Sequence, residues 1–162
     1  MVTTFLKRLK GLINVGYQQF NQGITPMNAA TSYHLKNAVT GTSSMDYAID
    51  YEKVVFSDGD LPEAKTPLIA TAATARLAFS WTDDTLPSDS ISGTHLATVL
   101  AYNIDKKKFT MFPSAAPRSA ETYVLQLPLD WVADEVHAWI SFVSVNGKEV
   151  SNSTYVGQIT IL

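Results

Sequence analysis

Apolar residues in the N-terminal part of the chain recur every three or four positions, which is the spacing of one face of an α-helix. The first run predicts a helix over residues 4–20, whose apolar stripe comprises Phe5, Leu6, Leu9, Leu12, Ile13, Tyr17 and Phe20. Thr25 offers an N-cap oxygen and Pro26 fits the first helical position, so a second helix is expected over residues 26–39. The two helices predict a hairpin that packs either against the rest of the chain or against another subunit.

The second helix has a narrower apolar stripe, which comprises Met27, Ala30, His34, Leu35 and Ala38. The small residues in this stripe indicate that another helix can approach it closely. Gly41 follows the stripe and is a suitable C-cap, because glycine readily adopts the left-handed conformation that ends many helices.

From Tyr47 onward the apolar pattern changes to an alternation of period two, which is typical of half-buried strands. Seven strands are expected, over residues 52–57, 75–82, 95–103, 107–112, 122–127, 135–145 and 154–162. Their number and length predict an antiparallel β-sandwich of the immunoglobulin or fibronectin type. The expected fold is therefore mainly β, with a basic α-helical hairpin in residues 1–45 and an acidic β-sandwich domain in residues 46–162.

The pattern also predicts which strand faces are buried. Apolar residues alternate with polar ones in two strands, at Leu77, Phe79 and Trp81 and at Tyr155, Gly157, Ile159 and Ile161. Residues 136–145 are apolar on both faces, which predicts a central strand that is covered on both sides or contacts the helices. Asn146 and Gly147 predict a type I′ turn between the last two strands, because both residues tolerate positive φ angles.

Charge is divided unevenly along the chain. Residues 1–45 contain four bases and no acid, for a net charge of +4, whereas residues 46–162 carry a net charge of −7. The basic end either solvates the helices or docks on nucleic acid, anionic lipid or the acidic body of a neighbouring copy. The candidate basic contacts are Lys7, Arg8 and Lys10.

Several segments carry a family resemblance that spans most of the chain. They are residues 28–41, residues 49–54, Leu127–Pro128 with Trp131, residues 134–137, and residues 146–153. In these segments the sequence resembles an uncharacterised bacterial family that is known only as a domain of unknown function. The resemblance implies no activity, cofactor or catalytic residue.

The residues that most often carry chemistry are absent or scattered. The chain has no cysteine, which excludes disulfides, thiolate metal sites and cysteine nucleophiles. His34, His95 and His137 lie on different predicted elements without the spacing of a zinc site. We expect His34 at the edge of its helical stripe and the other two histidines on half-exposed strand faces.

Asp58, Asp60 and Glu63 offer closely spaced oxygens that invite a calcium interpretation. They lack the distal glutamate of an EF-hand, so a polar turn between strands explains them better. The sequence contains no GxSxG, GxxxxGK[ST] or GxGxxG motif. We therefore expect no enzyme activity, no catalytic residue, no metal site and no cofactor.

The three tryptophans differ in their expected roles. Trp81 is expected in the core, and Trp131 is expected to plug a corner of the sandwich. Trp139 either packs against the helices or is exposed for contact with a sugar or a protein. The candidate interface comprises Phe5, Leu9, Leu12, Ile13 and Trp139.

These features favour a non-catalytic structural or interaction protein that associates with itself or with another protein in a virion, an appendage or a surface complex. One alternative is a carbohydrate- or ligand-binding module that uses an exposed aromatic residue and the loop over residues 83–93. A second is nucleic-acid association through the basic helix, which the acidic remainder disfavours. We expect neither a signal peptide nor a transmembrane segment, and hence a cytoplasmic protein or part of an assembled particle.

Overall fold

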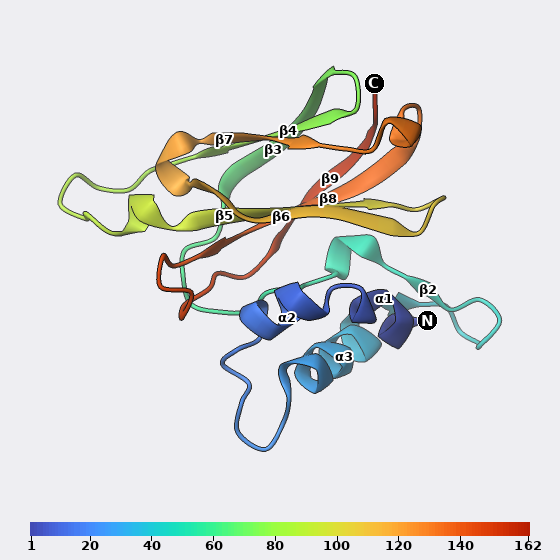
Figure 1. Cartoon of the computed structure of the whole chain (residues 1–162). Coiled ribbons are helices and arrows are strands. Elements are labelled where there is room, and N and C mark those ends of the chain that lie inside the picture. The colour runs from blue at the N-terminus through green and yellow to red at the C-terminus, as the bar shows by residue number, and fades with distance from the viewer.

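The computed structural model describes residues 1–162, except for the side chain of residue 72. Three helices come first, α1 (Val2–Lys7), α2 (Lys10–Gly16) and α3 (Pro26–Asn37), followed by the short strands β1 (Val39–Thr40) and β2 (Ala48–Ile49) and the 3₁₀ turn η1 (Tyr51–Lys53) (Figure 1). Seven strands follow, β3 (Lys65–Ala73), β4 (Arg76–Thr82), β5 (Leu96–Asn103), β6 (Lys108–Pro117), β7 (Thr122–Gln126), β8 (Glu135–Val143) and β9 (Thr154–Thr160). The 3₁₀ turns η2 (Ser92–Thr94), η3 (Arg118–Ala120) and η4 (Leu129–Trp131) connect some of them.

The strands form two antiparallel sheets, in the orders β3-β4-β7 and β6-β5-β8-β9. Between the sheets lies a core that includes Leu77, Phe79 and Trp81 from one sheet and Val99, Ala138 and Ile140 from the other. Trp131 in η4 closes this core and is 1% exposed. The mainly β sandwich, the positions of Trp81 and Trp131 and the buried face of β4 are thus confirmed.

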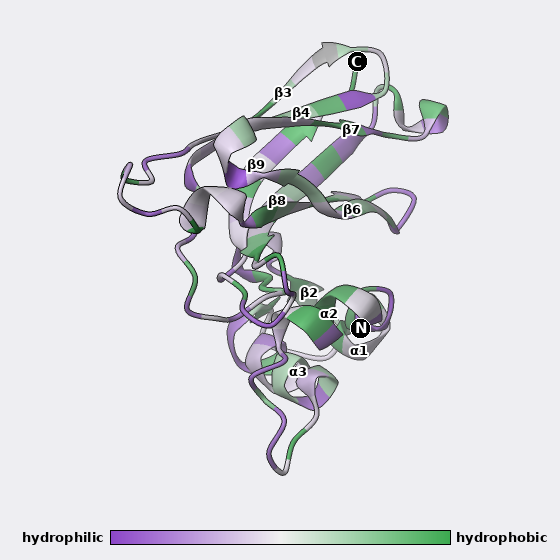
Figure 2. Cartoon of the chain, turned by 60° about the vertical axis from the view of Figure 1, so that its left-hand side comes forward, coloured by the Kyte–Doolittle hydropathy of each residue, from purple (hydrophilic) through white to green (hydrophobic). Residues whose placement is uncertain are grey.

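A second core lies on the outer face of the four-stranded sheet. There Leu100, Tyr102 and Trp139 pack against residues of α1 and α2, and α3 packs on those helices through Ala29 and Ala30. Figure 1 shows α1 and α2 directly beneath the sheet, with α3 below them, and in Figure 2 α1 and α2 are more hydrophobic than α3. Strand β8 is therefore covered on both sides, as its sequence predicts. Separately, β1 pairs with β2, so the chain forms a small sheet across the boundary that was expected at residue 45.

The single helix predicted over residues 4–20 is wrong, because the chain bends after Lys7. The N–H of Leu9 bonds to the carbonyl of Leu6 at 2.8 Å, which is the shorter spacing of a 3₁₀ turn, and α2 starts anew at Lys10. Leu6, Leu9 and Ile13 are at or below 1% exposed, so the apolar stripe is buried on both sides of the bend.

The second helix is confirmed, since it begins at Pro26 and the Thr25 hydroxyl accepts the Asn28 N–H at 3.2 Å. Two details of the prediction are wrong. Leu35 is 60% exposed and lies outside the buried stripe. Gly41 is not the C-cap, because α3 ends at Asn37, and its φ of 104° serves the turn between β1 and β2 instead.

Six of the seven predicted strands are present, and two regions differ. The strand predicted over residues 52–57 is replaced by η1 and an extended segment, whose Val54 and Phe56 face the second core. The strand β3 was not predicted, because Lys65, Thr66 and Pro67 interrupt its apolar pattern. It is an edge strand, where proline is tolerated.

The last hairpin also departs from its prediction. Gly147 has a positive φ of 74°, but Asn146 does not, and the N–H of Gly147 bonds to the carbonyl of Ser144. The turn is therefore not type I′. Further along, a β-bulge between Ala138 and Trp139 shifts the register of β9, so that Tyr155 joins the second core while Ile159 faces the sandwich core.

None of the helices in the described part of the chain is long and apolar enough to cross a membrane.

Candidate functional site

A groove of about 380 Å³ opens at the end of the molecule that carries the N-terminus, between α1, η1 and the turn that joins β5 to β6. Its floor consists of aromatic side chains, which are Phe5, Tyr51, Tyr102 and Phe109. Arg8 and Lys107 stand at its rim and are both exposed. The volume lies at the lower end of the range for sites that bind small molecules.

The aromatic rings of the floor contact one another closely. The ring of Phe5 lies 5.1 Å from that of Tyr102 and 5.1 Å from that of Phe109, both in edge-on geometry. Tyr102 and Phe109 are cross-strand partners in β5 and β6, with ring centroids 4.5 Å apart. Edge-on and tilted aromatic pairs add about 0.5–1.5 kcal/mol each beyond the area that they bury, so the floor is a fixed surface.

The floor of the groove is uncharged at Tyr51, which packs on His137. The ring of Tyr51 stacks on His137 at 4.4 Å, and Nδ1 of His137 lies 2.7 Å from the Tyr155 hydroxyl. Burial lowers the pKa of His137, while burial and the neighbouring Tyr102 raise the pKa of Tyr51 to about 12. Both side chains are therefore uncharged near neutral pH, and only the rim carries charge.

The turn that presents Lys107 is held by polar contacts. Asn103 is fully buried, donates to a carboxylate oxygen of Asp134 at 2.7 Å and accepts the N–H of Lys106 at 2.9 Å. Lys106 pairs with the same carboxylate. Lys107 itself has a φ of 53°, a left-handed conformation that the turn requires.

The rim presents two cations without partners. In the described part of the chain, the three ion pairs join Lys53 to Asp50, Lys65 to Asp84 and Lys106 to Asp134. Arg8 and Lys107 are in none of them. The groove therefore suits a ligand with an apolar group for the floor and an acidic group for the rim.

The structure places most of the candidate interface inside the chain. Leu9, Ile13 and Trp139 are at most 1% exposed, Phe5 is 7% exposed, and Leu12 is half-buried. The folded chain does not present them to a partner, because the outer face of the four-stranded sheet already covers them. They are core residues, and only Phe5 also lines the groove.

The three candidate basic contacts behave differently from one another. Lys7, Arg8 and Lys10 are all exposed, but Arg8 alone lines the groove.

The groove residues that sequence reasoning missed are Tyr51, Tyr102, Phe109 and Lys107. The alternation along β5 predicts that Tyr102 lies on the outer face of the sheet. No pattern in the sequence predicts that its ring contacts Phe5 of α1.

The histidines are more buried than the sequence predicts. His34, His95 and His137 are 1%, 4% and 6% exposed, so the expected edge and half-exposed positions are wrong. His34 lies between α3 and the segment that contains Val55, whereas His95 contacts Arg118 on the opposite side of the sheet from the helices. The three histidines are therefore packed side chains in three different parts of the fold.

The acidic residues within 58–63 do not form a cation-binding site in the structure. The Glu63 carboxylate accepts the side-chain N–H of Asn152 at 3.0 Å, and Gln19 donates to the carbonyl of Asp58 at 2.9 Å. Among the described side chains, no group of three or more His, Asp and Glu residues is placed to hold a metal ion.

Comparison with family models gives a match to a family of unknown function, DUF6266, over residues 1–157. The chain belongs to this family. The match to DUF6266 includes the three helices and runs into β9, so the family unit contains both the helical layer and the sandwich.

Two solved structures contain a similar sandwich. One is the twitchin kinase region from C. elegans, at 12% identity and a TM-score of 0.44, covering 64% of this chain and 17% of that one. Another is the fibronectin type III domain of the human collagen alpha-1(XX) chain, at 15% identity and a TM-score of 0.40, covering 62% of this chain and 87% of that one. The chain thus spans less than a fifth of the twitchin region. A search of curated protein sequences found no match.

Proposed function

We propose that the chain is a non-catalytic assembly protein whose copies associate through the groove between α1 and the β5–β6 turn. The observation that carries this proposal is the combination of an aromatic floor with the unpaired cations Arg8 and Lys107 at the rim. Aromatic and arginine side chains are the residues that most often dominate the energy of protein interfaces.

Charge complementarity favours another copy of the chain as the partner. Residues 1–45 carry a net charge of +4, while residues 46–162 carry −7. A basic rim is therefore attracted to the net negative charge of residues 46–162 in a second copy, and this attraction speeds association and orients the encounter. The proposal predicts that salt weakens the association.

The sandwich suits the role of a rigid body in an assembly. Both faces of its four-stranded sheet are covered, one by the second sheet and the other by the helices. The surfaces left for partners are the groove, the sheet edges, the loops and the outer face of the β3-β4-β7 sheet, where Leu68 and Val124 are exposed.

The two alternative functions have weaker support. The carbohydrate hypothesis relied on an exposed Trp139, but Trp139 is fully buried and cannot stack on a sugar. The nucleic-acid hypothesis relied on Lys7, Arg8 and Lys10, of which only Arg8 adjoins aromatic rings. Residues 46–162 carry a net charge of −7, which repels a phosphate backbone.

Size-exclusion chromatography with light scattering, over a wide range of protein and salt concentrations, tests the proposal. We expect the mass to rise with protein concentration and to fall with salt. The double variant Arg8→Glu with Lys107→Glu should be monomeric at every concentration. The matched variant Lys10→Glu with Lys36→Glu makes the same change in charge outside the groove and should still associate. A wild-type chain that stays monomeric throughout would overturn the proposal.

A further inference from the structure

We infer that the segment that enters the groove is the loop between β4 and η2 of a second copy, so that copies join head to tail. This loop, residues 83–91, is called the end loop below. The inference rests on the proposed function and names the partner surface for the same groove.

The end loop and the groove lie at opposite ends of the molecule. In Figure 1 the end loop projects at the left, whereas the N-terminus, whose residues Met1 and Thr4 line the groove, lies at the right. A chain cannot place its own end loop in its own groove in this arrangement. An end loop that enters a groove therefore has to come from another copy.

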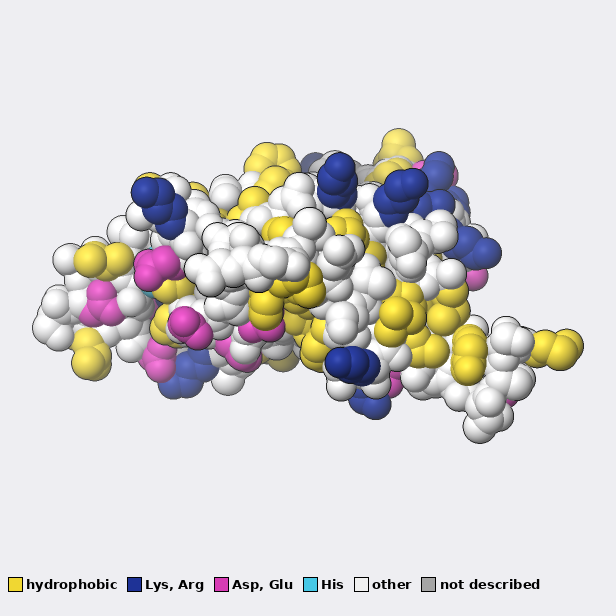
Figure 3. Space-filling view, turned by 90° about the horizontal axis from the view of Figure 1, so that it is seen from below, with side chains coloured by type: hydrophobic (Ala, Val, Ile, Leu, Met, Phe, Trp, Pro, Cys, Tyr) yellow, Lys and Arg dark blue, Asp and Glu magenta, His cyan; other side chains and the backbone are white. Residues whose placement is uncertain are grey.

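The end loop carries the chemistry that the groove lacks. Leu86 and Ile91 are 69% and 68% exposed, and they suit an aromatic floor. Asp83, Asp84 and Asp89 supply acidic groups, and residues 83–91 contain no lysine or arginine. Figure 3 shows acidic and exposed hydrophobic side chains together at this left-hand end of the molecule.

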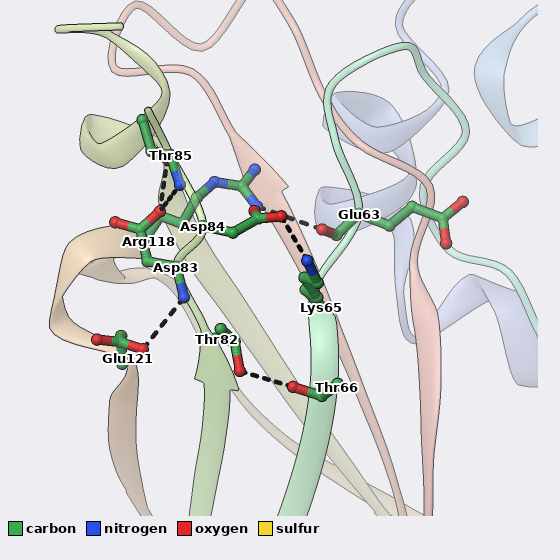
Figure 4. Close-up of polar contacts among 9 residues, drawn as sticks. All are labelled: Glu63, Lys65, Thr66, Thr82, Asp83, Asp84, Thr85, Arg118 and Glu121. Atoms are coloured by element: carbon green, nitrogen blue, oxygen red, sulfur yellow. Dashed lines mark hydrogen bonds and ion pairs between the residues drawn. The ribbon is translucent and has the colours of Figure 1, made fainter. Parts of the chain in front are cut away.

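The start of the end loop is anchored to the sandwich (Figure 4). The N–H of Asp83 donates to the Glu121 carboxylate at 3.1 Å, and an oxygen of Asp83 accepts the N–H of Thr85 at 3.0 Å. Lys65 pairs with Asp84 at 2.6 Å. This pair neutralises one of the three acids, whereas Asp83 and Asp89 belong to none of the ion pairs in the described part of the chain.

The far end of the loop is anchored as well. An oxygen of Asp89 accepts the N–H groups of Ile91 and Ser92 at 2.9 and 3.0 Å. Hydrogen bonds from Ser92 lower the pKa of Asp89 to about 2, so this carboxylate is charged near neutral pH. The carbonyl of Ser92 in turn accepts from Arg118 at 3.1 Å. A loop that is fixed at both ends loses little conformational entropy when it binds.

An interface between two different surfaces leaves one groove and one end loop unused in each pair. Further copies can add at both, so the assembly grows into a ring if the rotation closes and into a filament if it does not. A symmetric dimer would instead use the same surface on both copies. The two arrangements respond differently to variants that disable one surface.

The test uses two variants, each with one surface disabled. The groove variant is Arg8→Glu with Lys107→Glu, and the loop variant is Leu86→Ser with Ile91→Ser. All four side chains are exposed, so both variants are expected to fold. The control Leu68→Ser with Leu129→Ser removes two exposed apolar side chains elsewhere. Light scattering and sedimentation measure the mass of each variant alone and of the mixture.

We expect each variant alone to be monomeric and the equimolar mixture to have twice the monomer mass, because the intact end loop of one fits the intact groove of the other. The control should assemble like the wild type. A loop variant that still assembles, while the groove variant is monomeric, would overturn the head-to-tail inference and leave the proposed function standing. A wild-type chain that is always monomeric would overturn both.

Discussion

The imidazole Nε2 of His34 accepts the backbone N–H of Val55 at 3.1 Å. The other ring nitrogen, Nδ1, lies 2.7 Å from the carbonyl of Ala30 and therefore donates to it. The two bonds fix a neutral tautomer and tie α3 to the segment that leads from the helices to the sandwich. A proton on Nε2 would remove the acceptor for Val55.

Acid should weaken this link. Burial lowers the pKa of His34, and burial also lowers the pKa values of His95 and His137. The unfolded chain gains these protons at about pH 6.5 while the folded chain resists them. The contribution of these three neutral histidines to the free energy of unfolding is therefore fully present above about pH 6.5, and it is lost as the pH falls toward their folded-state pKa values.

Urea unfolding from about pH 7.5 down to about pH 5 measures this loss. We expect His34→Gln to reduce the acid loss without abolishing it, because the other two histidines still contribute. Equal slopes for the wild type and the variant would show that His34 is not the source of the pH dependence.

Two glycines of α2 should respond oppositely to the same substitution. A Cβ at Gly16 would lie 2.2 Å from the carbonyl oxygen of Phe56, so Gly16→Ala has to push the helix away from this segment. A Cβ at Gly11 would meet nothing within 4 Å. We expect Gly11→Ala to stabilise the chain by about 0.5–1 kcal/mol through helix propensity. Gly16→Ala should destabilise it by about 1–3 kcal/mol, as overpacking does.

Thermal and urea unfolding of both variants tests these two predicted changes in stability. If Gly16→Ala were as stable as Gly11→Ala, the close contact between α2 and the segment at Phe56 would not exist in solution.

Trp139 should matter for stability. Its side chain is fully buried in the second core, so Trp139→Ala is expected to cost about 3–5 kcal/mol in the free energy of unfolding. Phe112→Ala, at a side chain that is 50% exposed, is the matched control and should cost much less. Similar losses from the two variants in urea unfolding would contradict the position of Trp139 beneath the helices.

Arg118 should be irreplaceable by lysine. Its guanidinium donates to the carbonyl oxygens of Pro62 and Ser92 at 2.8 and 3.1 Å and lies 3.8 Å from the centre of the Phe142 ring. Lysine lacks the planar fork that reaches several acceptors at once. We expect Arg118→Lys and Arg118→Ala both to lower the free energy of unfolding by about 2–4 kcal/mol. Full stability of Arg118→Lys would show that charge alone suffices there.

The sequence predicts the parts of this fold that depend on local pattern. Strand β4 alternates cleanly because one of its faces is buried, and β8 has apolar residues on both faces because both are covered. The cap at Thr25 is likewise local, since it needs only a hydroxyl before Pro26. Each of these features follows from residues close together in the chain.

Features that depend on distant contacts were missed. The break near Leu9 leaves no mark in the apolar pattern, because the helical spacing of Leu6, Leu9 and Ile13 continues through it. Tyr155 shares its parity with Ile159, yet a bulge turns it toward the helices. The groove is the clearest case, because Phe5, Tyr51 and Tyr102 come from segments far apart in the sequence.

Hydrogen–deuterium exchange of the wild-type chain, at low and at high protein concentration, tests most directly whether copies meet at the groove. We predict slower exchange at high concentration in residues 1–8, 48–51 and 105–109, which surround the groove. The strand β3, at an edge of the sandwich, should exchange equally at both concentrations. Unchanged exchange around the groove, or protection confined to β3, would contradict the account.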